Sequence, residues 1–88
     1  MAWYQQRDKS EPQVIEALEA CGFTVKKISA RNFGDLVAAN AIRTIVVECK
    51  TGKSKLRPGQ QAWHDTWPGE KHVFRTADDV FAWHKRRF

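Results

Sequence analysis

The chain has 88 residues, a length typical of one domain, and we expect a single domain over residues 1–88. Its net charge of +5, from 15 Lys and Arg against 10 Asp and Glu, weakly favours a polyanionic partner. No signal peptide and no apolar run of about 18 residues is present, which argues against export and membrane insertion and favours a cytoplasmic location. Cys21 and Cys49 belong to no CxxC motif and have no histidine at ligand spacing, so two reduced, buried thiols are expected.

The first ten residues are polar after Trp3 and Tyr4, and we expect them to be flexible or to contact a second copy of the chain. Together with Phe88, these aromatic side chains favour a shared homodimer interface. Packing on the chain's own core is an alternative that the sequence leaves open.

A helix is predicted to begin at Ser10, with Pro12 in its first turn, and to end at Gly22. Its apolar stripe consists of Val14, Ile15, Ala17, Leu18 and Cys21. Residues 23–28 then predict a strand, and the two lysines within it place this strand near the edge of a sheet.

Residues 33–50 predict a β-hairpin, because two apolar runs flank Asn40 and Ala41, a pair typical of a tight turn. Residues 45–47 are apolar on both faces, as in a buried central strand. Side chains alternate between the faces of a strand, so one face holds Ile42, Thr44, Val46, Glu48 and Lys50 and the other holds Arg43, Ile45, Val47 and Cys49.

An acid and a lysine therefore end this strand on the same face. Asp35 begins the partner strand, and the hairpin could bring its carboxylate near Glu48. Two converging carboxylates and an amine make a site for a hard divalent cation and an activated water. The alternative is a solvated pair of Glu48 and Lys50, which the buried character of the strand disfavours.

A basic loop over residues 51–59 follows this strand directly and contains Lys53, Lys55 and Arg57. Beside a metal site, these three cations are predicted to contact phosphates of DNA. An ordinary solvated loop is the alternative.

A short helix is predicted from residue 60 to about residue 67, and its packed face consists of Gln60, Trp63, His64 and Trp67. A buried amide at Gln60 needs hydrogen-bond partners, which the site end of the hairpin could offer, while a plain polar helix start is the alternative. A strand over residues 71–74 and a helix that starts near Thr76 complete the chain. The inner face of this last helix is predicted to consist of Ala77, Val80, Phe81 and His84.

The predicted order of elements, with Asp35 and then Glu48-Cys49-Lys50 on the central strands, resembles the PD-(D/E)XK nuclease superfamily. Within it, the chain is similar to small stand-alone VRR-NUC-type nucleases, which are often phage-encoded and related in fold to archaeal Holliday-junction resolvases. The resemblance extends from about Arg7 to Trp83. It implies an α/β fold with a restriction-endonuclease-like core, in which helices flank a mixed sheet in the order αβββαβ(α).

Carried over to this sequence, the resemblance implies that Asp35, Glu48 and the backbone carbonyl of Cys49 bind Mg²⁺ or Mn²⁺. It adds Glu11 as a further carboxylate, with Glu16 as the alternative. Oxygen ligands favour these cations over Zn²⁺. One departure is Gly34, which stands where the family usually has proline.

The same resemblance assigns roles to two further side chains. Lys50 orients or deprotonates the attacking water and steadies the charge on the phosphate, and Gln60 supports Lys50 or the nucleophile. We therefore expect a metal-dependent DNA endonuclease, which acts as a homodimer on branched DNA such as Holliday junctions. The alternatives are a non-catalytic DNA-binding module and a subunit that only assembles a phage complex.

Overall fold

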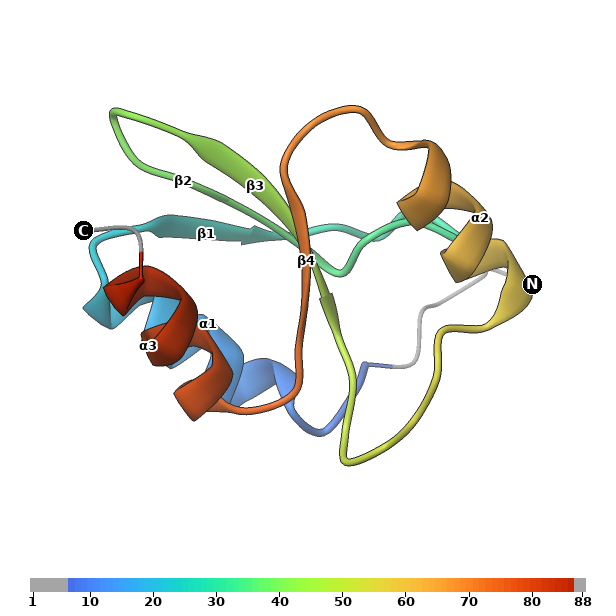
Figure 1. The fold of residues 1–88 in the computed structure, drawn as a ribbon, viewed down its shortest axis with the longest axis horizontal. Coiled ribbons are helices and arrows are strands. Elements are labelled where there is room, and N and C mark those ends of the chain that lie inside the picture. The colour runs from blue at the N-terminus through green and yellow to red at the C-terminus, as the bar shows by residue number, and fades with distance from the viewer. Residues whose placement is uncertain (1–6, 87–88) are drawn as a thin grey trace.

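The structure is a computed structural model that describes residues 7–86 (Figure 1). Its elements are α1 (Glu11–Ala20), β1 (Thr24–Lys27), β2 (Leu36–Ala39), β3 (Thr44–Cys49), α2 (Pro58–Thr66), β4 (Lys71–Phe74) and α3 (Ala77–Lys85). The predicted order of elements is confirmed, and the chain is an α/β protein. The expected interface at Trp3, Tyr4 and Phe88 lies outside the described residues.

The four strands form one mixed sheet in the order β1-β2-β3-β4. β1, β2 and β3 pair antiparallel, whereas β4 runs parallel to β3. β1 lies at an edge, as its two lysines predicted, and β3 lies inside the sheet. Both faces of β3 are buried from Ile45 to Cys49, which confirms the predicted central strand.

The turn between β2 and β3 sits one residue later than predicted. Its centre is Ala41 and Ile42, because the Asn40 side-chain oxygen accepts hydrogen bonds from the backbone N–H groups of Ile42 and Arg43, at 2.8 and 3.0 Å. A turn displaced by one residue shifts the strand register by two, so every side chain keeps its predicted face. Leu36 consequently pairs with Val47. Asp35 precedes Leu36 and Glu48 follows Val47, so these two residues come next at the same end of the hairpin.

Two helices, α1 and α3, lie side by side over one face of the sheet (Figure 1). They bury the alternate residues of β3 that point to this face, which are Ile45, Val47 and Cys49. From the helices come Val14, Ala17, Leu18, Val80 and Trp83. Val46 and Glu48 lie on the other face of β3, and Lys50 directly follows the strand.

The predicted inner face of α3 is confirmed at Val80 and Ala77, which pack on the core, and in part at the half-buried His84. It is wrong at Phe81, whose side chain is 45 % exposed. Trp83 takes the buried position, at 6 % exposure, with its ring centroid 5.7 Å from Phe23 and 5.6 Å from Phe74. Three residues after Val80, Trp83 lies on the same side of the helix. The indole also offers a larger apolar surface than any other side chain of α3.

α2 contacts the face of β3 that α1 and α3 leave open, because its Gln60 donates to Glu48. The helix begins at Pro58 and ends at Thr66, whereas residues 60–67 were predicted. Trp63 is buried there against Phe33, with 4.9 Å between ring centroids. His64 is only half-buried and Trp67 is 38 % exposed. Trp67 nevertheless contacts Phe33, with 5.1 Å between ring centroids. The predicted packed face of this helix is therefore confirmed at Gln60 and Trp63 and only in part at His64 and Trp67.

Neither cysteine forms a disulfide in the described part of the chain. Cys49 is buried as predicted, whereas Cys21 is half-buried because it lies at the end of α1, where the chain turns away from the core. Within residues 7–86, no helix is both long and apolar enough to cross a membrane.

Candidate active site

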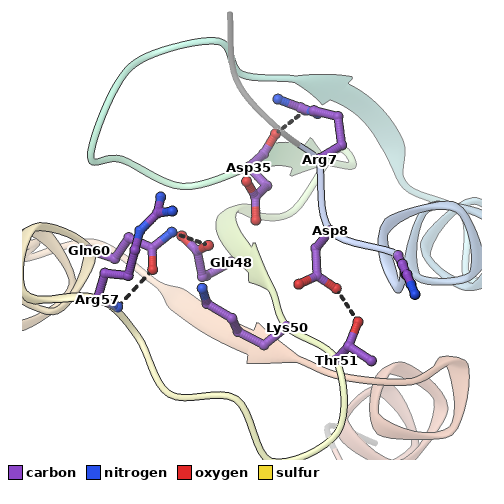
Figure 2. A pocket seen from close by; sticks show the side chains of 9 residues that line it. Arg7, Asp8, Asp35, Glu48, Lys50, Thr51, Arg57 and Gln60 are labelled. Carbon is purple, nitrogen blue, oxygen red and sulfur yellow. Dashed lines mark hydrogen bonds between the residues drawn. The ribbon is translucent and has the colours of Figure 1, made fainter.

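A pocket of about 370 Å³ opens at the ends of β2 and β3 that are remote from the hairpin turn (Figure 2). Its walls carry all four residues predicted as catalytic and one from the basic loop, namely Asp35, Glu48, Lys50, Gln60 and Arg57. The structure therefore brings together side chains that are up to 25 positions apart in the sequence.

Asp35 and Glu48 are the buried carboxylates of this pocket, at 4 % and 1 % exposure. The Asp35 carboxylate accepts a hydrogen bond of 2.8 Å from the backbone N–H of Cys49, and the Asp35 N–H donates to the Val47 carbonyl oxygen at 2.8 Å. These two bonds fix Asp35 against the end of β3. Cys49 thus contacts the site through its N–H group, while metal binding by its carbonyl stays a prediction.

Burial and the neighbouring Asp35 carboxyl raise the pKa of Glu48 to about 8, although the positive charge of Lys50 opposes this shift. The Trp63 indole also faces this carboxylate and favours its charged form. Even so, Glu48 Oε1 and Trp63 Nε1 both lack a hydrogen bond of ordinary geometry within residues 7–86. Two carboxyl groups thus crowd a space in which a cation would relieve their repulsion.

Gln60 fixes the orientation of Glu48. Its side-chain oxygen accepts the N–H of Arg57 at the start of α2, at 2.9 Å, so its amide nitrogen must face the other way. That nitrogen donates to Glu48 Oε2 at 3.1 Å. Gln60 therefore both caps α2 and holds Glu48, whereas the resemblance assigned its support to Lys50 or the nucleophile.

Lys50 follows β3 and keeps the direction of the strand, because its N–H donates to the Phe74 carbonyl oxygen at 3.2 Å. Its side chain points to the same pocket as Glu48 (Figure 2). The ammonium makes no ion pair within 4.0 Å in the described part of the chain. The Lys50 ammonium therefore lies in the same pocket as the Asp35 and Glu48 carboxylates without forming a close ion pair with either.

Gly34 positions Asp35 through close packing. A Cβ atom at Gly34 would overlap the Val46 side chain and would lie 3.3 Å from the Val47 carbonyl oxygen. Any larger residue, proline included, would push this segment away from β3. Close packing against β3 therefore gives a steric reason for glycine at position 34.

Neither Glu11 nor Glu16 lies in the pocket, although both were predicted candidates for metal binding. The Glu11 carboxylate is held by Arg7 through contacts of 3.0 and 2.9 Å and lies 3.8 Å from the Lys27 ammonium. Glu16 is exposed further along α1. Arg7 also donates to the carbonyl oxygens of Ile28 and Asp35, at 2.8 and 3.1 Å, so the segment before α1 is tied to the sheet.

Asp8 lies in the pocket and was not predicted from the sequence, because residues 1–10 were expected to be flexible or to contact a second copy of the chain. Its Oδ1 accepts the backbone N–H of Ser10 at 3.0 Å, the Ser10 hydroxyl at 2.8 Å and the Thr51 hydroxyl. Partial burial raises the pKa of Asp8, but the hydrogen bonds from Thr51 and Ser10 outweigh this and hold it below its usual value. The local signal was a short Asp-x-Ser turn before a helix.

The basic loop is only partly in the pocket. Arg57 lines it, whereas Lys53 and Lys55 are exposed outside it. Arg75 holds the loop in place, because its Nη1 donates to the carbonyl oxygens of Gly52 and Ser54 at 2.9 and 2.7 Å. The loop is thus held by the residue that follows β4, and it presents its lysines to solvent.

The donor set of the pocket suits a hard cation. The carboxylates present oxygen atoms only, and the Cys49 side chain points to the other face of the sheet. Glu48 Oε1 is buried and lacks a hydrogen bond of ordinary geometry within the part of the chain that the structure describes. Among the described residues, no three His, Cys, Asp or Glu side chains lie close enough to bind a metal by themselves. Two carboxylates and several waters are the usual environment of Mg²⁺, so Asp35 and Glu48 fit this ion.

Comparison of the chain with protein-family models, with curated proteins and with solved structures found no match. The function is therefore inferred from the geometry and chemistry of the pocket.

Proposed function

We propose that the chain is a Mg²⁺- or Mn²⁺-dependent endonuclease that hydrolyses phosphodiester bonds in DNA, with the restriction-endonuclease-like core of the PD-(D/E)XK superfamily. One observation carries this proposal. Two buried carboxylates, Asp35 and Glu48, meet at the end of a central strand, and the Lys50 ammonium lies in the same open pocket.

Each side chain has a role that follows from its position. Asp35 and Glu48 would hold the cation, which when bound supplies an activated water and compensates charge on the phosphate. Lys50 adds a second positive charge at the reacting phosphate and orients the attacking water, since its ammonium has three donors and, among residues 7–86, no competing ion pair. Gln60 keeps Glu48 in the orientation that this arrangement needs.

The substrate is proposed from charge and from the resemblance. The net charge of +5 and the cations at residues 53, 55 and 57 favour a nucleic-acid backbone. The resemblance favours branched DNA, with Holliday junctions foremost, and a homodimer in which a two-fold axis relates two pockets. Such a pair of sites would suit the cutting of two strands of one junction.

The test is cleavage of single-stranded, duplex, flap and four-way DNA in Mg²⁺, Mn²⁺, Ca²⁺ and EDTA. We expect cleavage in Mg²⁺ or Mn²⁺ only, and its loss in Asp35→Asn and Glu48→Gln, which keep the size of each side chain. Glu16→Gln, which changes an exposed carboxylate outside the pocket, is the matched control. Full activity in excess EDTA would refute the proposal, and tight DNA binding without cleavage in any cation would favour the non-catalytic module.

A further inference from the structure

We propose that Asp8 is the third carboxylate of the cation site and that it acts by holding water in the hydration shell of the ion. This inference rests on the proposed function. It replaces Glu11 with a residue of the segment that precedes α1, and the reasons lie in how the two acids are placed.

Glu11 is already paired with cations, although its buried Oε1 has an ion-pair contact and no hydrogen bond within residues 7–86. Arg7, which lines the pocket, contacts both of the Glu11 carboxylate oxygens, and Lys27 adds a second positive charge, so the acid is neutralised without itself lining the pocket. Moving Glu11 into the pocket would break this ion pair and strip a buried residue of its partners, which is costly. Arg7 would also lose its part in tying the segment to Ile28 and Asp35.

Asp8 faces the pocket and is held there. All of its hydrogen bonds within residues 7–86 go to Oδ1, from Ser10 and Thr51, and Oδ2 is left without a donor. Figure 2 shows the Asp8 carboxylate across the pocket from Asp35 and Glu48. Because Thr51 directly follows Lys50, its hydroxyl links Asp8 to the strand end that carries Lys50 and Glu48.

A second observation points to a ligand in this space. Glu48 is 1 % exposed and lines the pocket, and although the Trp63 indole faces its carboxylate, Oε1 has no hydrogen bond of ordinary geometry in the described part of the chain. A group in the pocket would satisfy this oxygen and would at the same time lie between Glu48 and Asp8.

The contact between Asp8 and the ion passes through water. No three acidic side chains of residues 7–86 lie close enough to bind a metal together, so Asp8 cannot join Asp35 and Glu48 as a direct ligand in this conformation. Mg²⁺ normally keeps several of its waters, and a carboxylate that accepts hydrogen bonds from them stabilises the bound ion. Groups of this kind typically contribute about 10- to 100-fold in metal affinity.

The experiment measures Mn²⁺ binding to the full chain without DNA, by electron paramagnetic resonance and by calorimetry with Mg²⁺ competition. Asp8→Asn keeps the oxygen that accepts from Ser10 and Thr51 and removes the charge. It should weaken Mn²⁺ binding about 10-fold or more. Glu11→Gln should leave the affinity within about two-fold of the wild type, even if it lowers the melting temperature by freeing Arg7.

A purely structural role for Asp8 would change the melting temperature in EDTA and leave Mn²⁺ affinity unaltered, and that result would overturn the inference. If Asp8→Asn does not fold, Thr51→Val decides, because it removes only the tie between Asp8 and the strand end. It should weaken Mn²⁺ binding, Thr51→Ser should restore it, and an unchanged affinity in Thr51→Val would again overturn the inference.

The same binding measurements distinguish failure of the proposed function from failure of the role proposed for Asp8. If the wild type binds neither Mn²⁺ nor Mg²⁺, both proposals fall. If the wild type binds the ion and Glu48→Gln abolishes binding while Asp8→Asn does not reduce it, only the role of Asp8 is wrong.

Discussion

Lys50 is the residue that best separates an enzyme from a DNA-binding module. Its ammonium lies in the pocket with Asp35 and Glu48 and forms no close ion pair within residues 7–86, so it is available to a phosphate. Lys50→Ala should lower the single-turnover cleavage rate by about 100-fold or more, the scale expected when one preorganised stabilising group is removed. Lys50→Arg should not restore the rate, because the guanidinium is larger and stays protonated.

The measurement pairs single-turnover rates on a four-way junction with binding isotherms in Ca²⁺. Binding should weaken only modestly, since one of many cations is removed. Lys26→Ala, which removes an exposed lysine of the edge strand β1, is the control and should alter neither quantity much. If Lys50→Ala reduces rate and affinity by the same factor, the lysine is only a phosphate anchor.

Strand periodicity was enough to predict the residues on the sheet. Alternation placed Glu48 and Lys50 on one face, and the need of a buried amide for partners led to Gln60. Arg7 and Asp8 could not be predicted in this way, because no periodic pattern covers them. Their positions depend on hydrogen bonds to residues 21, 28 and 43 positions away, which only the folded chain brings near.

At the scale of elements, the hairpin shows what a sequence pattern determines and what it leaves open. The apolar runs determined which side chains share a face, and this survived a shift of the turn by one residue. The turn itself was set by Asn40, whose side chain accepts two backbone N–H groups, a local contact that composition does not locate. Because of this shift, Asp35 lies opposite Glu48 on the neighbouring strand. With the predicted turn, Asp35 would lie opposite Val46, two residues away from Glu48 along the strand.

The last helix shows a second limit. Helical spacing predicted a stripe through Val80 and Phe81, yet Trp83 is the residue that packs on Phe23 and Phe74. Phe81 and Trp83 each fit helical spacing, because each lies three or four residues after another apolar residue of the inner face. The larger indole surface and the shape of the aromatic cluster decide between them, and neither can be derived from one short segment.

The basic loop is the element that should set DNA affinity. Arg75 fixes the loop by hydrogen bonds to two of its backbone carbonyl groups. The loop therefore loses less conformational entropy when its cations bind phosphates. Changing Lys53, Lys55 and Arg57 together to Gln should weaken DNA binding and flatten its salt dependence. The log–log slope should fall by about 0.9 for each phosphate that the loop no longer neutralises.

The slope is measured from binding isotherms in Ca²⁺ over a range of salt concentrations. Lys26→Gln is the comparison, because it removes a positive charge from the edge strand without touching the loop. A slope that is unchanged in the triple variant would mean that the loop is merely solvated.

At the scale of the whole molecule, one face of the sheet carries the apolar core and the other carries the candidate site. The helices α1 and α3 lie over one face of the sheet (Figure 1) and bury its apolar side chains, while Asp35 and Glu48 are buried at the rim of the other face. Apolar burial stabilises the fold, whereas burial of two carboxyl groups in contact opposes it. The site therefore lowers the stability of the metal-free protein, by an amount that depends on pH.

The sign of this dependence follows from Glu48. Its pKa is raised from 4.5 to about 8 in the folded protein, so the folded state keeps a proton that the unfolded chain releases above pH 4.5. The contribution of this group to the free energy of unfolding should therefore fall as pH rises from about 4.5 to 8 and level off above, by on the order of a few kcal/mol. Glu48→Gln cannot ionise and should lose this dependence.

Urea unfolding in EDTA at several pH values between 5 and 9 measures the effect as the difference in free energy of unfolding between Glu48→Gln and the wild type. The difference should grow in favour of the variant as pH rises, because only the wild type must bury a charge beside Asp35. Glu16→Gln, on the exposed side of α1, should follow the wild type throughout. Parallel curves for Glu48→Gln and the wild type would show that Glu48 is charged in the fold without penalty, and the repulsion that makes this pocket receptive to a cation would be absent.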